Sequence, residues 1–537
     1  MQEACQPEPW AALARPAAYP GDRSAGAGVE WIQTHISHVY RTPERVYKFR
    51  KPVDLGFVRF ASRAERDADC LREVALNRRL APDVYLGVAA LRGEPGALHL
   101  GPVAEELAGA AEHCVVMRRL PDGRDALSLL RAGRLSPSHL EALAGLVARF
   151  HAAHGLGVPA PFSRDEWLER CTRPAADNFE SLGRTPGGRL DAALLERARS
   201  RSAALALARA ERFERRRQAG RAVDGHGDLH LEHVWFEDEE RPIAIDCIEF
   251  DERLRRIDAA AEVAFPAMDL VYRGRPELAE GFLAGYARES DDFDLYSVLD
   301  WFVAYRAGVR AKVAALAAAD AEIAAEQRER AGESARRHLE LATRALEERP
   351  AGPLVLVSGV VGAGKSSVAR ALADLVGGVV VSSDRVRKRL LGLPPTARAR
   401  ADWGGGAYAP AVSERTYAGL LERARPVLAS GRPALCDATF SRRAWRRAAV
   451  DLAQQLGSRA LLIEVSCDAR VARERLARRA KAGGDPSDAG PEDLERSARD
   501  FEAAGEWPAE RALIRTDRAD WRECLEGIAG RIRERGR

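Results

Sequence analysis

The 537-residue chain is poor in lysine, which supplies only six of its 83 basic side chains, so arginine carries almost all of the positive charge. The chain has no run of 18 uninterrupted apolar residues, so no membrane-spanning helix is expected. Its eight cysteines are scattered without a C-x-x-C pair, which disfavours a disulfide framework or a cysteine-based zinc site and favours reduced thiols. The first nine residues lack the apolar core of a signal peptide. We therefore expect a cytoplasmic protein.

The chain is long enough for several domains, and its composition changes beyond the middle. The segment Arg-Pro-Ala-Gly-Pro over 349–353 interrupts a helix-forming stretch and is the expected domain boundary. From residue 351 onward the net charge is +9, whereas the first 350 residues carry −6. A basic C-terminal part suits an anionic ligand. The expected parts are an irregular segment over 1–27, a first domain over 28–349 and a second over 353–537.

The most specific motif begins where the apolar segment 354–358 runs into Gly359-Val-Val-Gly-Ala-Gly-Lys-Ser. This pattern, G-x-x-x-x-G-K-S between a strand and a helix, is typical of a phosphate-binding loop. The glycines let backbone N–H groups surround phosphate oxygens, and the helix N-terminus attracts the anion. Lys365 should reach the β- and γ-phosphates of ATP, and Ser366 should bind Mg²⁺. The expected nucleotide-binding residues are Gly359, Gly362, Ala363, Gly364, Lys365, Ser366 and Ser367.

Short apolar segments alternate with helix-forming stretches around and after this loop. Such alternation predicts strands joined by helices, and hence an α/β domain with a parallel sheet. The expected strands span 354–358, 379–382, 434–437, 461–466 and about 512–515.

Aspartates end two of these expected strands, at the edge where open parallel sheets bind their ligands. Asp384 could accept the proton of an attacking hydroxyl, and Asp437 could orient Mg²⁺ as a Walker-B-type aspartate does. Arg385 or Arg387 could hold an anionic acceptor. Arg475, from an arginine-rich helix, could approach the γ-phosphate as part of a mobile lid. The alternatives are ordinary strand-end or helix caps for the aspartates and a solvent-exposed basic face for the arginine-rich helix.

The N-terminal part has its own polar group, in His226-Gly-Asp-Leu-His-Leu-Glu-His and the apolar run that follows it. Asp228 lies on an expected loop and Asp246 ends the next apolar run, so these carboxylates could act as catalytic base and metal ligand. Lys48, on an expected early strand, could contact the α- and β-phosphates of ATP. Glu73, on a helix expected over 62–80, could hold Lys48 in place.

The histidines of this block also admit a different interpretation. On one continuous helix His226, His230 and His233 would share a face and could bind zinc. Gly227 and Asp228 favour a loop instead.

Residues 353–537 resemble the small P-loop kinases of the zeta-toxin and polynucleotide-kinase type, on the basis of the phosphate-binding loop and of Asp384 with its neighbouring arginines. The resemblance implies ATP-dependent phosphoryl transfer in which Asp384 is the base that activates the acceptor. Because members of that family phosphorylate different hydroxyls, the resemblance does not name the acceptor.

Residues 28–345 resemble aminoglycoside phosphotransferases and choline-kinase-like enzymes, since His-Gly-Asp228-Leu-His is similar to their catalytic loop and Ile-Asp246 to their metal-binding aspartate. The resemblance implies a bilobal kinase-like fold that uses ATP and Mg²⁺, with a hinge at 115–120 that places Met117 at the nucleotide. The whole chain is similar to bacterial two-domain proteins in which such an enzyme is fused to a P-loop, AAA-family predicted kinase.

One residue departs from that family pattern. The family loop has an asparagine, which binds Mg²⁺, five residues after its aspartate, and this chain has His233 there. Imidazole is a poor ligand for Mg²⁺, which prefers oxygen. Three possibilities follow: the domain binds one metal ion instead of two, recruits Glu232, or has lost transfer activity.

The expected function is therefore ATP-dependent phosphotransfer by two kinase-like domains to a hydroxyl of a small molecule. One alternative is an ATP-binding regulator with an N-terminal pseudokinase, which His233 favours. Another is a polynucleotide 5′-end kinase, which the basic C-terminal part favours, although no interleaved aromatic and basic residues indicate a strand-binding groove. No membrane partner is expected. The acceptor and the oligomeric state stay open, and the charged stretch 318–348 could be a spacer or a dimer surface.

Overall fold

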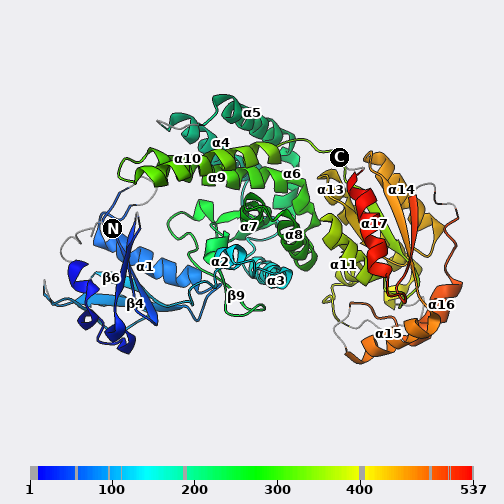
Figure 1. Ribbon diagram of the computed structural model, residues 1–537, viewed down its shortest axis with the longest axis horizontal. Helices are drawn as coiled ribbons and strands as arrows, with labels where there is room; N and C mark the ends of the chain where they lie inside the picture. Colours follow the sequence, from blue (N-terminus) through cyan, green and yellow to red (C-terminus); the bar gives the residue numbers. More distant parts are fainter. Residues whose placement is uncertain are drawn as a thin grey trace. The chain divides into compact units, whose positions relative to one another are not determined.

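The structure is a computed structural model that describes residues 10–34, 36–54, 59–94, 97–109, 112–185, 190–397, 406–482, 486–505, 507 and 510–534. The chain divides into two compact units, Met1–Cys171 with Arg215–Asp269 and Thr172–Glu214 with Leu270–Arg537. Figure 1 labels their helices and strands. Among the described residues, no helix is both long and apolar enough to cross a membrane.

The first unit contains a six-stranded antiparallel sheet in the order β1-β2-β3-β6-β4-β5. Successive side chains of a strand point to opposite faces, so a sheet covered on both sides can bury every residue of a central strand. In β6, Val115 packs on one face, whereas Cys114 and Val116 pack on the other. The strands are β1 (Glu30–Gln33), β2 (Ser37–Arg41), β3 (Arg45–Arg50), β4 (Tyr85–Arg92), β5 (His99–Leu100) and β6 (His113–Arg118).

Helix α1 (Arg63–Asn77) covers one face of this sheet, packing on β4 and β6 (Figure 1). Its start is fixed by a capping box, in which the Ser62 hydroxyl accepts from the Glu65 N–H and the Glu65 carboxylate accepts from the Ser62 N–H. Cys70 and Val74 are buried against the sheet. The helix predicted over 62–80 is confirmed.

Residues 10–27 cover the opposite face. They form three 3₁₀-helices, η1 (Trp10–Ala14), η2 (Pro16–Ala18) and η3 (Arg23–Ala27). Leu13 and Tyr19 are buried in one cluster with Phe49 of β3, because short helical turns bring these apolar side chains onto the sheet. The segment expected to be irregular is thus ordered over its described part, and residues 1–9 lie outside the described residues.

The polar loops of the first unit are carried by two short antiparallel strand pairs. β7 (Ala222–Asp224) pairs with β10 (Arg256–Asp258), and β8 (Val234–Phe236) pairs with β9 (Pro242–Ala244). Asp228 lies between β7 and β8, and Asp246 follows β9. The helices around them are α2 (Ala126–Arg131), α3 (Pro137–Ala153), α4 (Arg164–Arg184), α6 (Ala210–Gln218) and α7 (Ala259–Tyr272), of which the last three belong in part to each unit.

The second unit begins with a helical part. Helix α10 (Ala325–Ala345) packs along α9 (Leu299–Ala319) and against α5 (Ala192–Ala208), and it buries Leu339 and Ala342 (Figure 1). Helical structure is interrupted between α9 and α10, so the charged stretch 318–348 is not one helix. Because α10 buries a face on its neighbours, it is not a free-standing spacer, and its role as a dimer surface stays a prediction. Helix α8 (Pro276–Ser290) and η6 (Phe293–Ser297) precede α9.

A five-stranded parallel sheet forms the rest of the second unit, in the order β12-β13-β11-β14-β15. The predicted α/β domain with a parallel sheet is confirmed. Its strands are β11 (Leu354–Ser358), β12 (Val379–Ser382), β13 (Ala434–Asp437), β14 (Ala460–Ser466) and β15 (Glu510–Arg515). Its helices are α11 (Lys365–Val376), α12 (Ser383–Leu390), α13 (Pro410–Ala429), α14 (Arg443–Gln455), α15 (Ala469–Ala482), α16 (Leu494–Arg499) and α17 (Trp521–Glu534).

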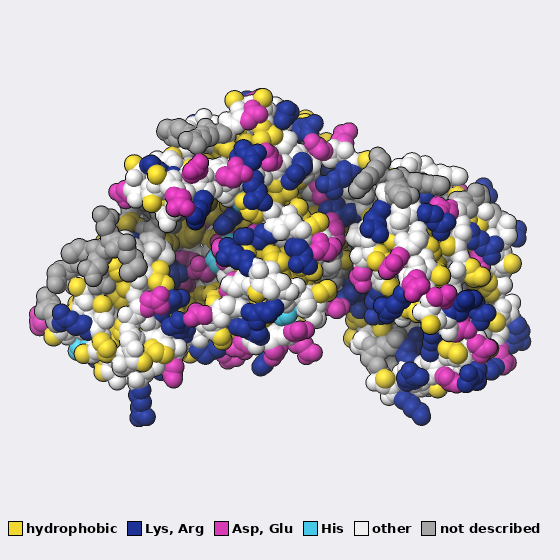
Figure 2. Space-filling model, in the orientation of Figure 1, with side chains coloured by type: hydrophobic (Ala, Val, Ile, Leu, Met, Phe, Trp, Pro, Cys, Tyr) yellow, Lys and Arg dark blue, Asp and Glu magenta, His cyan; other side chains and the backbone are white. Residues whose placement is uncertain are grey.

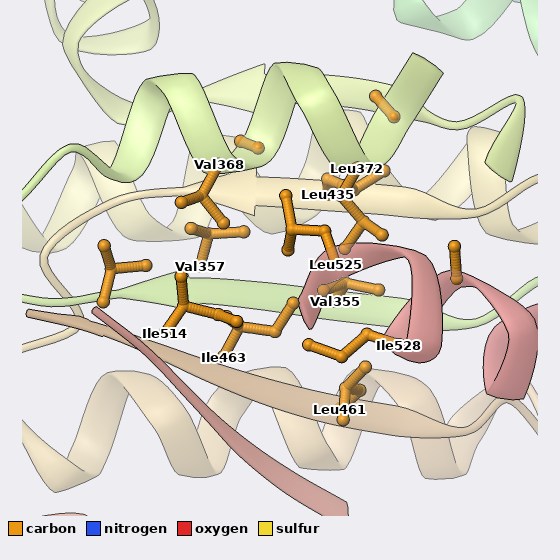
Figure 3. Close-up of a cluster of buried hydrophobic side chains, with 14 of the residues drawn as sticks. Val355, Val357, Val368, Leu372, Leu435, Leu461, Ile463, Ile514, Leu525 and Ile528 are labelled. Carbon is orange, nitrogen blue, oxygen red and sulfur yellow. The ribbon is translucent and has the colours of Figure 1, made fainter. Parts of the chain in front are cut away.

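The core of this sheet explains why its central strands are continuously apolar. Figure 3 shows Val355 and Val357 of β11 packed with Leu372 of α11 and Leu525 of α17 on one face. Helices α13 and α14 cover the other face. A parallel sheet buried on both faces needs apolar side chains at successive positions, and all five residues of β11 are buried.

Within the second unit, ion pairs join the helical part to the α/β part. Arg432 Nε lies 2.7 Å from Glu280 of α8, and Arg432 Nη2 lies 2.9 Å from Asp300 of α9. Arg423 of α13 also pairs with Asp291, at 2.6 Å. These two parts therefore pack as one compact unit.

Candidate active sites

The phosphate-binding loop in the second unit leaves the end of β11 and enters α11 at Lys365. Gly364 is the residue before the helix, with φ of 94°, and a Cβ there would lie 3.0 Å from Thr516 Oγ1. A Cβ on Gly359, where φ is 148°, would lie 2.2 Å from the Val465 carbonyl oxygen. Glycine is therefore needed at both positions, for conformation and for space.

A cavity of about 840 Å³ opens beside this loop and brings the predicted C-terminal site residues together. Five of the seven predicted loop residues line it, whereas Ala363 is fully buried and its carbonyl accepts a 2.7 Å hydrogen bond from Thr516 Oγ1. Gly359 shapes the base of the loop. The other predicted residues that line the cavity are Asp384, Arg387, Asp437 and Arg475.

The two aspartates face the loop from neighbouring positions of the sheet edge. Asp437 ends β13, in register with Val357 of β11 and Ser382 of β12, and it is buried. Asp384 lies in the first turn of α12, directly after β12. Burial raises the pKa of Asp384, and the Asp437 charge adds to that rise. A carboxylate with a raised pKa is a better proton acceptor than an ordinary aspartate.

Lys365 is the cation of the loop. Its Nζ donates a 3.0 Å hydrogen bond to the Val360 carbonyl oxygen. Burial lowers the pKa of this ammonium group, and the charges of Asp437 and Asp384 oppose that effect. A phosphate oxygen could replace the Val360 carbonyl as acceptor, which is how a loop lysine reaches its phosphates.

Two arginines of α12 have different surroundings. Arg387 is buried beside the cavity, where its Nη1 donates to the Ala407 carbonyl at 2.7 Å and its guanidinium lies 4.6 Å from the Tyr408 ring centre. Arg385 instead pairs with Glu289 at 3.0 Å and is not among the residues lining the cavity. Of the two candidates for an anionic acceptor, only Arg387 is placed to meet it.

The arginine-rich helix is α15, and its inner face borders the cavity. Arg475 Nη1 donates to Thr516 Oγ1 at 2.7 Å and Nη2 to the Thr516 carbonyl at 3.0 Å. Arg475 is therefore held against β15 rather than exposed. Arg479, one turn later, also lines the cavity and donates to the Ala489 carbonyl at 3.3 Å. Helical periodicity could have grouped these two arginines, but no sequence signal shows which face is turned inward.

Aromatic residues that sequence reasoning missed complete this cavity. Tyr417 of α13 stacks on Trp445 of α14, with ring centres 3.9 Å apart. The Tyr417 hydroxyl bonds Thr439 Oγ1 at 2.9 Å, so the ring pair is fixed beside the strand end that carries Asp437. Both rings, with Tyr408, line the cavity. They belong to distant segments, and only the fold brings them together.

A second centre lies in the first unit, around Lys48 of β3. Lys48 Nζ lies 2.9 Å from Glu73 Oε1 of α1 and 2.7 Å from Asp246 Oδ1. The predicted pairing of Lys48 with Glu73 is present in the structure. The Lys48 charge holds the pKa of Asp246 well below its usual range.

The Asp228 loop closes this centre from the other side. His233 Nδ1 lies 2.9 Å from the Asp228 carbonyl oxygen, and His233 Nε2 lies 3.6 Å from Asp246 Oδ2. Asp228 and Asp246 keep 34% and 45% of their side chains exposed, so solvent reaches both carboxylates. Lys48, Glu73, Asp228, His233 and Asp246 thus meet in one centre, as the sequence predicts. Met117 packs against the hydrophobic cluster between β6 and α1, and its place at the nucleotide stays a prediction.

The proposed three-histidine zinc cluster is not formed. Residues 226–233 are a loop that ends in a single 3₁₀ turn, η4 (Leu231–His233), and not a continuous helix. His226 Nε2 bonds the Ile245 carbonyl at 2.9 Å, and His226 Nδ1 accepts from the Asp228 N–H at 3.3 Å. Burial lowers the pKa of His226 to about 3, so it is a neutral structural histidine.

A buried charge network supports the Lys48 centre from behind. Arg50 Nε lies 2.7 Å from Asp69, and Arg50 Nη2 bonds both Glu73, at 2.6 Å, and Glu249. Burial raises the pKa of Glu249 to about 8. The Asp69, Glu73 and Glu249 carboxylates surround a guanidinium, so this acidic group already contains its cation. Sequence reasoning missed Arg50, because its partners lie on α1 and on the segment after Asp246.

Comparison with known proteins matches both parts of the chain. Residues 45–302 match the phosphotransferase enzyme family, and residues 354–504 match an AAA domain. Uncharacterized proteins of Mycobacterium tuberculosis and Mycobacterium bovis are 33% identical over 460 residues, covering 84% of this chain and 86% of theirs.

Among solved structures, a gluconokinase from Sinorhizobium meliloti is 20% identical, with a TM-score of 0.25, over 35% of this chain and 96% of its own. The adenosine-phosphosulfate (APS) kinase CysC of Mycobacterium tuberculosis, in complex with AMPPNP and APS, is 18% identical, with a TM-score of 0.23, over 34% and 97%. At these TM-scores the likeness assigns no function.

Proposed function

We propose that this chain is an ATP-dependent phosphotransferase. It belongs to the same family as these mycobacterial proteins and consists of a phosphotransferase domain followed by a P-loop kinase domain. The C-terminal cavity is its principal catalytic site. The observation that carries this proposal is the meeting of the 359–367 loop with Asp384 and Asp437 in one cavity. Such a cavity contains a phosphate cradle, oxygen ligands for a metal ion and a candidate base.

The residues of this cavity fit ATP and Mg²⁺. The loop from Gly359 to Ser367 would hold the phosphates, and Lys365 would exchange its bond to Val360 for phosphate oxygens. Ser366 and Asp437 offer the hard oxygen donors that Mg²⁺ prefers. When bound, Mg²⁺ neutralises part of the phosphate charge.

Asp384 is the proposed base. It takes the proton of the acceptor hydroxyl while the acceptor oxygen forms a bond to the γ-phosphorus. The bond from that phosphorus to the bridging oxygen breaks, and ADP leaves. Its raised pKa suits this role. Arg475, held on Thr516, is placed at the cavity to compensate the charge of the transferring group.

The proposed acceptor is a small molecule with a hydroxyl and an anionic group. Arg387 supplies the cation for that group, and its Nε has no hydrogen-bond partner among the described atoms although it is buried. Tyr408 and the Tyr417–Trp445 pair supply apolar faces that pack on a ring or a carbon chain. Positive charge and aromatic faces together suit such an acceptor better than a polycation.

The N-terminal centre is proposed as a second nucleotide site, in which Lys48 binds the α- and β-phosphates, Asp228 is the base and Asp246 a metal ligand. The intact Lys48–Glu73 and Lys48–Asp246 pairs support this. Met117 has only its position in β6 to support a role as a hinge residue. A pseudokinase regulator is the alternative, favoured by His233 at the centre.

A polynucleotide 5′-end kinase is the remaining candidate. It rests on the basic charge of the C-terminal part. In Figure 2, however, acidic side chains are interspersed among the basic ones over the face of that part which is shown. An uninterrupted basic groove, which strand binding needs, is not visible on that face.

The test is transfer of labelled γ-phosphate from MgATP to a pool of small polar metabolites, with a 5′-hydroxyl oligonucleotide in parallel. Lys365→Ala should lower the transfer rate on the order of 10²–10³-fold, and Asp384→Asn on the order of 10²–10⁴-fold. Lys481→Ala and Asp451→Asn, at exposed positions, are the matched controls and should keep the wild-type rate. Equal rates in Lys365→Ala and the wild type would overturn the assignment of the P-loop cavity as the catalytic site. Transfer to the oligonucleotide alone would mean that the acceptor is a nucleic acid and not a small molecule.

A further inference from the structure

The N-terminal centre offers more nitrogen atoms as possible metal ligands than a magnesium site does. Ligand atoms of Asp228, His230 and His233 all lie within 4.8 Å of one another, and His233 Nε2 lies 3.6 Å from Asp246 Oδ2. Two of these four side chains are imidazoles. Mg²⁺ takes oxygen ligands in near-octahedral geometry, so this donor set does not fit it.

The hydrogen bond of His233 determines which of its nitrogens is available. The Asp228 carbonyl oxygen can only accept, so His233 Nδ1 must donate to it across 2.9 Å. In the neutral ring, Nε2 then has no proton and turns its lone pair toward Asp246. A histidine that binds a metal commonly donates its other N–H to a backbone carbonyl or a carboxylate, as His233 does here.

The two oxygens of the Asp246 carboxylate face different partners. Oδ1 pairs with Lys48 at 2.7 Å, whereas Oδ2 faces His233 Nε2. Two acceptors that face each other at 3.6 Å repel unless a proton on Nε2 or a metal ion lies between them. Two metal–ligand bonds of about 2.1 Å span that distance at an angle of about 120°, which tetrahedral or five-coordinate metal sites accommodate.

The remaining polar residues of the centre surround His233 on the side of its Nδ1. Asp228 Oδ2 lies 3.5 Å from His233 Nδ1 and 3.6 Å from His230 Nε2, and it is partly exposed. His230 Nδ1 accepts from the Glu232 N–H at 3.3 Å, which leaves its Nε2–H directed at Asp228. His230 therefore lies beside the Asp228 carboxylate, and water can occupy the open positions of the metal because Asp246 is 45% exposed.

We propose that the N-terminal domain holds a divalent transition-metal ion, of the Zn²⁺ class, on His233 Nε2 and Asp246 Oδ2, with water in its remaining positions. Imidazole selects such ions over Mg²⁺. The two domains then differ in metal preference, with Mg²⁺ on the oxygen donors of Ser366 and Asp437 and a softer ion on the N-terminal centre. This inference does not depend on phosphoryl transfer by the P-loop domain.

The test is metal binding by the full-length protein without nucleotide. Calorimetry with Zn²⁺ and Mg²⁺ should show one Zn²⁺ site with an affinity at least on the order of 100-fold above that for Mg²⁺. Co²⁺, used as a probe, should give visible absorption bands of a nitrogen-ligated, low-coordinate ion. His233→Asn should weaken Zn²⁺ binding on the order of tenfold or more and remove those bands, while His99→Asn, on β5, should change neither.

His233→Gln and thermal unfolding of both variants separate loss of the ligand from loss of the fold. A wild-type melting curve with lost metal binding supports the site. Equal affinity for Mg²⁺ and Zn²⁺, or Co²⁺ bands that persist in both His233 variants, would overturn it. Because the readout is metal affinity, it is independent of whether an acceptor is ever phosphorylated.

Discussion

The two carboxylate centres contain similar residues in opposite electrostatic settings. Asp246 in the first unit pairs with Lys48 at 2.7 Å, and the lysine holds its pKa below the usual range. Burial raises the pKa of Asp384 in the second unit, and the charge of neighbouring Asp437 adds to that rise. A carboxylate paired directly with a cation stays ionised and suits metal or phosphate chemistry, whereas one whose burial outweighs the charges of nearby Lys365 and Arg387 binds protons more readily. The balance between burial and counter-charge therefore decides which aspartate is suited to act as a base.

The same comparison explains how each centre is stabilised. The first centre rests on Arg50, which joins three carboxylates beneath Lys48. The second rests on an apolar sheet whose strand ends point at the phosphate loop. Removing the support should therefore harm the two centres by different mechanisms.

The largest expected effect comes from Arg50→Met. It leaves Asp69 and Glu249 buried without their cation and Glu73 with Lys48 alone, so the first unit should lose about 3–5 kcal/mol of stability. The matched control is Arg41→Leu, which breaks the exposed pair with Glu30 and should cost less than about 1 kcal/mol. Hydrogen exchange in β3 and α1 measures the local stability. Equal protection in the two variants would show that the network is not required.

Sequence alone indicated which residues gather at each centre but not what supports them. Lys365, Asp384 and Asp437 were predictable because a loop motif and strand ends have fixed places in a parallel sheet. Arg50 was not, because its carboxylates come from positions 69, 73 and 249, whose proximity depends on how α1 packs on the sheet. The Tyr417–Trp445 pair was missed for the same reason.

Where sequence reasoning named a residue without its partner, the structure changed its interpretation. Arg385 and Arg387 are two positions apart on one helix and equivalent as sequence, but Arg385 pairs with Glu289, while Arg387 lines the cavity. Likewise, His226 and His233 belong to one motif, yet only His233 faces a carboxylate of the centre. Helix position and loop path decide such cases, and neither is encoded by residue type.

A smaller effect, on KM for the acceptor, is expected when the two arginines of α12 are replaced. The two substitutions compare neighbouring positions of one helix. Arg387→Leu removes the cation proposed to bind the acceptor, so KM for the acceptor should rise about 10–100-fold, which corresponds to the loss of a charge-assisted hydrogen bond. Arg385→Leu loses the partly exposed pair with Glu289 and a hydrogen bond to the Arg288 carbonyl oxygen, neither of them at the cavity, and should change KM less than about threefold. Transfer kinetics with the metabolite pool measure both. Similar changes in the two variants would remove Arg387 from the acceptor site.

The smallest expected effect is the contribution of each aspartate to the free energy of unfolding. It tests the comparison most directly, because its dependence on pH has opposite signs in the two centres. Asp384 has a folded-state pKa above the ordinary 3.8, so its contribution to stability falls as pH rises from 3.8 through the raised value. Asp246 has a folded-state pKa below 3.8, so its contribution is present above 3.8 and is lost as pH falls through the lowered value.

At neutral pH the neutral isosteres should therefore act in opposite directions. Asp384→Asn removes a poorly solvated charge and should stabilise the second unit by on the order of 1 kcal/mol. Asp246→Asn removes the partner of Lys48 and should destabilise the first unit by no more than about 1 kcal/mol, because the exposed part of Asp246 is screened by solvent. Urea unfolding, with hydrogen exchange assigning each transition to its unit, measures both. Shifts of the same sign would mean that the two aspartates share one electrostatic setting, and the division into base and metal ligand would then have no physical basis.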